Sequence, residues 1–265
     1  NNKLWILEAD ESDRSLLKLN PTHTLLTNIG NDHLSEKILI ETFNKFKNQT
    51  KEIFQKGILN QFNNFNINHN LIGKHNKDNA LYALSFSYRY GIDIKTTLKA
   101  IKSFKGIERR LEFIGYTKNK IKIYDDYAHN SMKIDATLNA LSDKNHNYGT
   151  HAFWRPHGHS SFNNSFLELI DVFSRFLDNK KNTLSLLPIY YAGGTVKTKY
   201  TSEDLLDQIN LSNTFYANGY EELGKIISSK KFLGDILVGM GARDPNISKF
   251  LKSLKSENLW SLIVY

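Results

Sequence analysis

The feature of this chain that most constrains its fold is a repeated alternation of short apolar runs and amphipathic segments over its second half. Short apolar runs of this kind are typical of buried strands, whereas the segments between them carry apolar residues at helical spacing. The expected strands are residues 149–154, 183–190, 214–217, 235–239 and 260–265, and the expected helices are residues 162–177, 202–209, 220–229 and 246–254. Strands that alternate with helices predict an α/β fold, with a mostly parallel sheet and helices on both faces.

The segments upstream of this alternation are less regular. A hairpin is predicted from residues 111–116 and 120–124, turning at residues 117–119. The other expected elements are strands at residues 4–7 and 24–28, helices at residues 14–19, 35–55, 76–90 and 94–104, and an asparagine-rich connector at residues 60–70. With 265 residues, of which 40% are hydrophobic, the chain can bury one sizeable core or two smaller ones, and we expect two domains.

Composition excludes several classes of protein. The chain has no cysteine, which excludes a disulfide framework and thiolate metal sites and points to a reducing compartment. It contains neither a cleavable signal pattern nor an apolar run long enough to span a bilayer, so a cytoplasmic protein without membrane insertion is expected. The net charge of +8 is scattered over amphipathic segments rather than gathered in a basic block. This distribution favours a small polyanionic substrate over a nucleic acid.

Charged residues gather around the end of the second hairpin strand. Asp125 and Asp126 follow its apolar run directly, His129 comes shortly after, and Arg109 and Arg110 lie just upstream of the hairpin. Ligands of α/β proteins bind beyond the carboxyl ends of the strands, where these side chains are expected. A guanidinium group fits phosphate oxygens in a bidentate manner, so the arginines are candidates for a phosphate clamp. The alternative for them is a salt-bridged pair on the surface.

Two acidic segments are candidates for a metal site. Glu8 follows the predicted strand at residues 4–7, and carboxylate oxygens are suitable ligands for magnesium. The alternative is a solvated acidic loop that caps the next helix. His33, beside Asp32, follows the strand at residues 24–28 and is a candidate second ligand from a neighbouring strand. The alternative for His33 is a structural histidine after a turn.

A polar segment precedes the helix that ends before Gly91. It contains His75, Asn76 and Asn79. An asparagine amide offers a donor and an acceptor together, which matches the edge of an adenine base. Ordinary helix capping is the alternative.

Other polar loops follow the later strands. They contribute His157, Tyr191, Gly241 and Arg243 as candidates for substrate contacts, because glycines there allow the backbone to approach a ligand closely. His157 and His159 lack a nearby third metal ligand, which argues against a metal site. Residues 219–225 have the glycine and lysine spacing of a phosphate-binding loop, but Ile226 stands where serine or threonine is required. Since the segment also reads as a helix, it is rejected.

In this order the motifs resemble those of the Mur ligases, the ATP-dependent amide-forming enzymes of peptidoglycan synthesis. The resemblance covers nearly the whole chain and rests on five motifs. In chain order they are residues 8–13; residues 27–29 and 32–33; residues 73, 75–76 and 79–80; residues 104, 106, 109–110 and 112; and residues 125–129. Residues 11–13 favour the branch of the family that adds L-alanine to UDP-N-acetylmuramic acid. The Arg-Arg-Leu-Glu sequence at residues 109–112 is also similar to the branch that adds a recycled tripeptide to the same sugar nucleotide.

The resemblance implies domains, a reaction and roles. Residues 1–106 would be the remnant of the central ATP-binding domain, and residues 107–265 the Rossmann-like C-terminal domain. In the family, ATP phosphorylates the lactyl carboxylate of UDP-N-acetylmuramic acid, and an amine attacks the acyl phosphate. The implied roles are magnesium binding by Glu8 and His33, nucleotide binding by His75, Asn76, Asn79, Asp125 and Asp126, catalysis by Arg109, Arg110 and His129, and substrate binding by His157, Tyr191, Gly241 and Arg243.

The departures from the family pattern shape a further expectation. The family's Gly-Lys-Thr phosphate loop and its UDP-binding domain would lie upstream of Asn1, and Asn130 replaces the family proline after the signature histidine. Arg243 stands where glycine is common in the family. We therefore expect this polypeptide not to catalyse ligation alone. A start without methionine favours an enzyme fragment over the alternative, a shortened non-catalytic module that binds nucleotide and amino acid.

Overall fold

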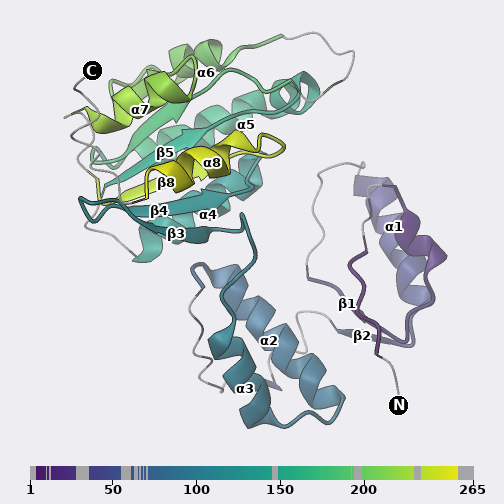
Figure 1. The fold of residues 1–265 in the computed structure, drawn as a ribbon. Helices are drawn as coiled ribbons and strands as arrows, with labels where there is room; N and C mark the ends of the chain where they lie inside the picture. Colours follow the sequence, from purple (N-terminus) through teal and green to yellow (C-terminus); the bar gives the residue numbers. More distant parts are fainter. Residues whose placement is uncertain are drawn as a thin grey trace. The chain divides into compact units, whose positions relative to one another are not determined.

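The computed structural model describes residues 4–9, 11, 13–27, 36–54, 61–62, 65, 67, 69, 71–144, 149–191, 193, 199–229 and 234–255. The chain divides into two compact units (Figure 1). The N-terminal unit comprises Asn1–Asn70 and Lys74–Phe104, and the C-terminal unit comprises Leu71–Gly73 and Lys105–Tyr265. Among the helices in the described part, none is long and apolar enough to cross a membrane. The strand predicted for residues 260–265 lies outside the described residues.

The C-terminal unit is built on a six-stranded sheet with the order β3-β4-β8-β5-β6-β7. Its strands are β3 (Glu112–Tyr116), β4 (Lys122–Asp126), β5 (Thr150–Trp154), β6 (Thr183–Leu186), β7 (Thr214–Tyr216) and β8 (Ile236–Met240). β3 pairs with β4 in an antiparallel hairpin, and all other pairs are parallel. The predicted α/β fold, the mostly parallel sheet and the hairpin are thus confirmed.

Helices cover both faces of this sheet (Figure 1). They are α4 (Ser131–Lys144), α5 (His159–Leu177), α6 (Ser202–Ile209), α7 (Tyr220–Ser228) and α8 (Asn246–Ser253). Successive side chains of a strand point to opposite faces. Trp154 and Val238 accordingly pack with α4, α5 and α6, whereas their neighbours Phe153 and Leu237 pack with α7 and α8. The strands are buried on both faces, which explains why they read as continuous apolar runs.

Helix α4 is missing from the sequence-based expectation, although its sequence carries a helical signal. Ile134, Leu138 and Leu141 are buried at helical spacing in the core of the C-terminal unit. The side chain of Asn130 accepts a hydrogen bond from the backbone N–H of Lys133 at 2.9 Å, as a helix N-cap does. The residue that replaces the family proline therefore starts this helix.

Two other expectations concern the ends of elements. The strand predicted for residues 183–190 is too long, because β6 ends at Leu186. Pro188 has no backbone N–H and cannot continue the ladder of hydrogen bonds. Residues 219–225 enter helix α7, so the rejection of a phosphate-binding loop there is correct.

The N-terminal unit contains a short parallel pair of strands and several helices. Its elements are the 3-10 helix η1 (Ser15–Lys18), β1 (His23–Leu25), α1 (Glu36–Asn48), β2 (Glu52–Phe54), α2 (Lys74–Arg89) and α3 (Ile94–Ser103). Helices α2 and α3 pack through Leu81 and Leu84 of α2 against Leu98 and Ile101 of α3. Asp93 caps α3 by accepting the N–H of Thr96 at 2.9 Å.

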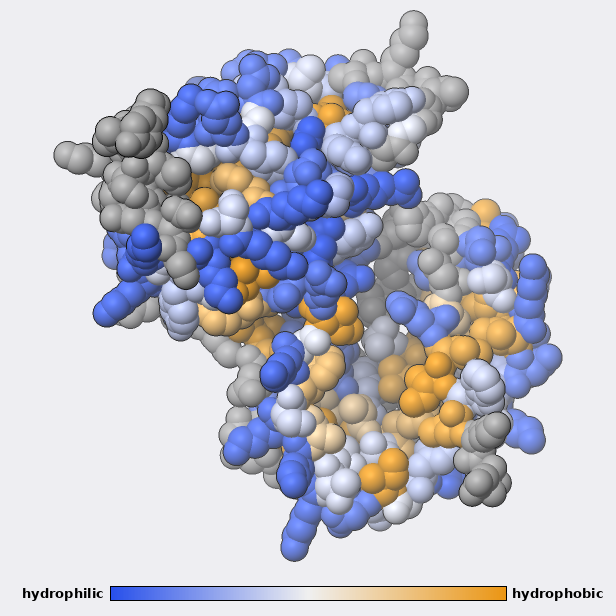
Figure 2. Space-filling model, viewed as in Figure 1, coloured by the Kyte–Doolittle hydropathy of each residue, from blue (hydrophilic) through white to orange (hydrophobic). Residues whose placement is uncertain are grey.

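Three predictions in this unit are wrong. Residues 4–7 form no strand, and Trp5 and Ile6 are 79% and 81% exposed, because the segment pairs with neither β1 nor β2. Figure 2 shows hydrophobic residues in orange on the surface of this unit. The helix predicted for residues 35–55 ends at Asn48, since residues 52–54 pair with β1 instead and tertiary pairing overrides helical propensity. The helix predicted for residues 14–19 is reduced to η1.

Candidate functional site

The carboxyl ends of β4, β8 and β5 lie side by side because these strands pair in parallel. Asp126 at the end of β4 and Trp154 at the end of β5 both pair with Met240 at the end of β8. Beyond β6, Tyr190 forms a further bridge with His157. The loops that follow these strands therefore emerge at one edge of the sheet, which we call the carboxyl edge. This is the place where α/β proteins bind their ligands.

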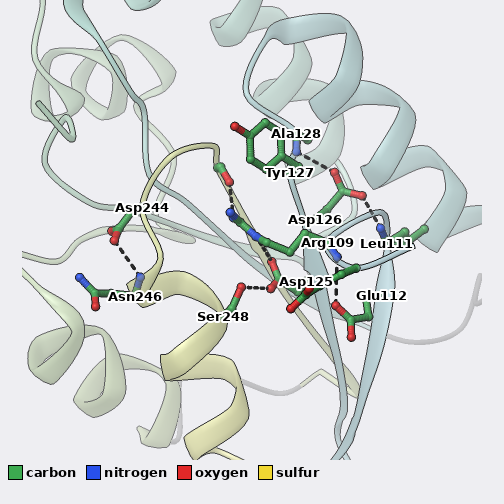
Figure 3. Close-up of polar contacts among 12 residues, drawn as sticks. Arg109, Leu111, Glu112, Asp125, Asp126, Tyr127, Ala128, Asp244, Asn246 and Ser248 are labelled. Carbon is green, nitrogen blue, oxygen red and sulfur yellow. Dashed lines mark hydrogen bonds and ion pairs between the residues drawn. The ribbon is translucent and has the colours of Figure 1, made fainter. Parts of the chain in front are cut away.

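A buried ion pair joins Arg109 to Asp125 at this edge (Figure 3). The Nε of Arg109 lies 3.3 Å from a carboxylate oxygen of Asp125, which is fully buried, and the guanidinium also donates to the backbone oxygen of Gly241. Ser248 of α8 donates its hydroxyl to the other oxygen of Asp125. Burial raises the pKa of Asp125, although the Ser248 hydrogen bond and the Arg109 charge oppose that shift. The pair ties together the segment before β3, the end of β4, the loop after β8 and helix α8.

The Asp126 side chain joins the segment before β3 to the loop after β4 by accepting two backbone N–H groups (Figure 3). One carboxylate oxygen accepts the N–H of Leu111 at 2.6 Å, and the other accepts the N–H of Ala128 at 2.7 Å. Burial raises the pKa of Asp126, and these two N–H groups oppose the shift. Arg109 and Leu111 both have positive φ angles, of 57° and 48°. A backbone strained in this way is held by its surroundings, here by Asp126 and by Glu112, which accepts the N–H of Arg109 at 3.0 Å.

The two arginines occupy different environments. Arg109 has a side chain that is 16% exposed, with donors engaged inside the protein. Arg110 is exposed. Both guanidinium groups lie over the ring of Tyr127, at 5.0 Å for Arg109 and 5.8 Å for Arg110. Of the two, Arg110 is the more exposed to solvent beside Tyr127.

Two histidines meet at the carboxyl edge. The ring centroids of His129 and His157 are 5.2 Å apart, and the ring of His129 also contacts that of Tyr127. Burial, with the charges of His129 and Arg243, lowers the pKa of His157 to about 4. The Nδ1 atom of His157 is buried and has no hydrogen-bond partner in the described structure. His157 is therefore neutral near pH 7, and its buried Nδ1 is unpaired among the described residues.

The remaining predicted substrate residues lie near these histidines in the fold. Gly241 directly follows β8 and is buried, and its N–H donates to the backbone oxygen of Asp126 at 3.2 Å. Arg243 is exposed with a φ of 61°. Tyr191 is 67% exposed in the loop after β6. The structure thus brings the loops of Asp126, His129, His157, Gly241 and Arg243 to one edge.

The predicted nucleotide residues of the other unit lie at the start of α2. His75 and Asn79 are exposed, and Asn76 is half-buried. Asn76 and Asn79 are three residues apart, so they share one face of this helix. Both belong to the N-terminal unit, whereas Asp125 and Asp126 belong to the C-terminal unit.

The predicted magnesium ligands are described only in part. Glu8 is exposed in a segment without regular structure, and His33 lies outside the described residues. Among the residues that the structure describes, no group of three histidine, aspartate or glutamate side chains is arranged to hold a metal ion. Of the two predicted ligands, Glu8 is thus the one whose place is described, and the described residues place no such set of three around it.

Sequence reasoning missed one cluster at the carboxyl edge. Arg155 and Asp244 form an ion pair of 2.6 Å, in which Asp244 is fully buried. The available signal was a charged residue in each of two loops that follow buried strands, Arg155 directly after β5 and Asp244 four residues after β8.

Comparisons with known proteins agree with this fold. No protein-family model matches the chain. The UDP-N-acetylmuramate–L-alanine ligase of Dictyoglomus turgidum is 30% identical over 298 residues, covering 91% of this chain and 62% of that protein. The ligase of the same name from Clostridium acetobutylicum is 36% identical over 182 residues, covering 68% of this chain and 38% of that protein. The chain thus spans less than two thirds of the length of these relatives.

Solved structures share the fold at lower identity. A UDP-N-acetylmuramate–alanine ligase from Thermotoga maritima aligns with a TM-score of 0.69 and 18% identity, covering 92% of this chain and 61% of that chain. A MurF ligase from the same organism, in complex with ADP, aligns with a TM-score of 0.58 and 13% identity, covering 89% of this chain and 62% of that chain.

Proposed function

We propose that this chain, which belongs to the Mur ligase family, is part of an ATP-dependent ligase that joins L-alanine to UDP-N-acetylmuramic acid. The observation that carries the proposal is the 30% identity over 91% of the chain to a protein named for that reaction. As the family resemblance implies, we also propose that residues 1–106 are part of the central ATP-binding domain and that residues 107–265 are the C-terminal domain.

The reaction proposed is the one that the family resemblance implies. A carboxylate oxygen of the lactyl group first forms a bond to the γ-phosphorus of ATP, the bond from that phosphorus to the bridging oxygen of the β-phosphate breaks, and ADP leaves, which gives an acyl phosphate. The nitrogen of the amino acid then forms a bond to the acyl carbon, the bond from that carbon to the phosphate oxygen breaks, and inorganic phosphate leaves while the amine loses a proton. Such chemistry depends on positioning the reactants and on offsetting phosphate charge.

The carboxyl edge offers suitable groups for an amino acid. A zwitterionic amino acid needs a cation for its carboxylate and an acceptor for its ammonium. Arg243 is an exposed cation, and it is near enough to His157 for its charge to contribute to the low pKa of that histidine. His157 has a pKa of about 4, so its neutral imidazole can accept a hydrogen bond from the ammonium without keeping the proton. His129 and Tyr191 complete the proposed substrate side.

We assign the phosphate contact to Arg110 rather than to Arg109. Arg110 is exposed, whereas the Nε and one terminal nitrogen of Arg109 donate to Asp125 and to the backbone oxygen of Gly241. Since Asp126 already accepts two backbone N–H groups, a ribose contact there would use its remaining lone pairs. His75, Asn76 and Asn79 remain the proposed adenine contacts in the N-terminal unit. Glu8 and His33 remain the proposed magnesium ligands.

The test is a ligation assay on protein expressed from the complete reading frame. ATP, magnesium and UDP-N-acetylmuramic acid are supplied with L-alanine or with the tripeptide, and the product is identified by its mass. We expect the alanine product. A product with the tripeptide alone would establish the recycling reaction instead, and nucleotide binding without any product would establish a non-catalytic module; either result overturns the proposal.

The site assignments are tested by calorimetry on the same protein. Arg110→Ala and Asn79→Ala should weaken ATP binding, whereas His157→Gln should weaken L-alanine binding and leave ATP binding unchanged. Arg175→Lys is the matched control, because Arg175 pairs with Asp135 and Asp171 on α4 and α5, away from the carboxyl edge. Unchanged affinities in all three variants would show that the assigned roles are wrong.

A further inference from the structure

Arg155 connects several strand ends at the carboxyl edge. It directly follows β5, and its own N–H donates to the backbone oxygen of Met240 at the end of β8, at 3.1 Å. Its Nε donates to the backbone oxygen of Pro188, beyond β6, at 3.2 Å, and a terminal nitrogen lies 2.6 Å from Asp244, beyond β8. The guanidinium also stacks on the ring of Tyr190, with 5.2 Å to the centroid. One side chain therefore touches the loops after β6 and β8 from its position after β5.

Asp244 is the matching anchor. It is fully buried, and besides Arg155 it accepts the hydroxyl of Tyr220 at 2.6 Å and the N–H of Asn246 at 2.9 Å. Although burial opposes it, these hydrogen bonds and the Arg155 charge hold the pKa of Asp244 below its ordinary value. Tyr220 begins α7 and Asn246 begins α8. The carboxylate thus fixes the starts of both helices on this face relative to Arg155.

The connected loops are those proposed to bind the amino acid. His157 lies two residues after Arg155, and two backbone hydrogen bonds join its loop to the loop after β6. The N–H of Gly158 donates to the backbone oxygen of Tyr190 at 3.1 Å, and the N–H of Tyr190 donates to that of Pro156 at 2.8 Å. Arg243 immediately precedes Asp244. The distance between His157 and Arg243 is consequently set on both sides by the Arg155–Asp244 pair.

We propose that Arg155 and Asp244 are positioning residues that hold the His157 loop and the Arg243 loop at the separation required to bind an amino acid. The consequence for amino-acid binding rests on the proposed function, whereas the placement of the loops rests on these contacts alone. Arginine is required because its planar guanidinium group donates hydrogen bonds to the Pro188 oxygen and to the Asp244 carboxylate at the same time. A lysine ammonium cannot reproduce that arrangement.

The test compares Arg155→Lys and Asp244→Asn with the wild type, with Arg175→Lys as the control. Hydrogen exchange should become about tenfold faster at the amides of Gly158 and Tyr190 in both variants, because local opening of the loops no longer breaks a charged pair. Exchange at Val238, in the middle of β8, should not change. The pKa of His157, measured by NMR titration, should rise from about 4 toward its ordinary value as the loop loosens. The affinity for L-alanine should fall about tenfold or more, with unchanged affinity for ATP.

The outcomes separate this inference from the proposed function. If the wild type binds no amino acid, the proposed function fails, and loop exchange with the His157 pKa still decides the positioning role. Unchanged exchange and an unchanged His157 pKa in both variants would overturn it. Faster exchange at Val238 together with the loops would also overturn it, because that pattern means general destabilisation. If Arg155→Lys does not fold, Asp244→Asn, which preserves shape, provides the same comparison.

Discussion

Replacing Arg109 with alanine tests whether the first arginine of the pair is structural. The substitution leaves Asp125, which is fully buried, without its cation and removes the hydrogen bond to the Gly241 oxygen. Breaking a buried ion pair from one side costs about 3 to 5 kcal/mol, and the lower end applies because the Arg109 side chain is 16% exposed. We therefore expect the free energy of unfolding of the C-terminal unit to fall by about 3 kcal/mol at pH 8.

The size of this loss should depend on pH. Burial already raises the pKa of Asp125, and removal of Arg109 raises it further. The folded state then binds a proton at a pH where the unfolded state does not, so the stability of the variant falls as pH rises through the folded pKa. The loss should therefore be smaller at pH 5 than at pH 8, because a proton on Asp125 removes its unpaired charge.

Urea unfolding followed by tryptophan fluorescence measures these values, because Trp154 is buried in the core of the C-terminal unit. Arg110→Ala is the matched control, and its loss should stay below about 0.5 kcal/mol because Arg110 is exposed. An equal loss in the two variants, or a loss for Arg109→Ala that is the same at pH 5 and pH 8, would refute the reasoning.

Three further predictions concern single residues of the C-terminal unit. Gly241→Ala should lower the free energy of unfolding by about 2 kcal/mol, because φ is 142° and a Cβ would lie 2.7 Å from the Arg155 oxygen; Gly219→Ala, where nothing lies within 4 Å, is the control in urea unfolding. Burial lowers the pKa of His151 from 6.5 to about 3, so the unfolded state binds a proton first and stability is lost as pH falls below 6.5. Between pH 7.5 and pH 5 this amounts to about 2 kcal/mol, and an equal pH dependence in His151→Gln would contradict the assignment. Asn130→Ala should lower the free energy of unfolding by about 1 kcal/mol in thermal or urea unfolding. Asn130→Asp should keep the wild-type value, since an aspartate side chain can also cap α4.

The sequence predicted the C-terminal sheet well because its strands are buried on both faces. Continuous apolar runs such as residues 236–240 are hard to place anywhere except in the middle of a sheet. The errors arose where local pattern and tertiary pairing disagree. Residues 4–7 are as apolar as a buried strand yet pair with no strand in the described structure, and residues 52–54 leave a helical pattern to pair with β1.

The candidate site shows the same division. The sequence indicated Asp125, Asp126 and His129 from their place after a strand, and it indicated His157 and Gly241 from theirs. It could not tell that Arg109 pairs with a buried carboxylate while Arg110 is exposed, because two adjacent arginines are equivalent in sequence and only the backbone conformation directs them to different environments. The φ angles of Arg109 and Leu111 make that turn.

The sequence by itself determined the α/β class, the order of most elements and the residues that follow each strand, because periodicity and strand burial are local properties of the chain. Only the tertiary structure decided which of those residues meet. The parallel pairing of β4, β8 and β5 brings loops from distant parts of the chain to one edge. The Arg155–Asp244 pair joins residues 89 positions apart. Contacts of this kind depend on the order of the strands in the sheet, which joins segments far apart in the chain and is not set by the local pattern of any one of them.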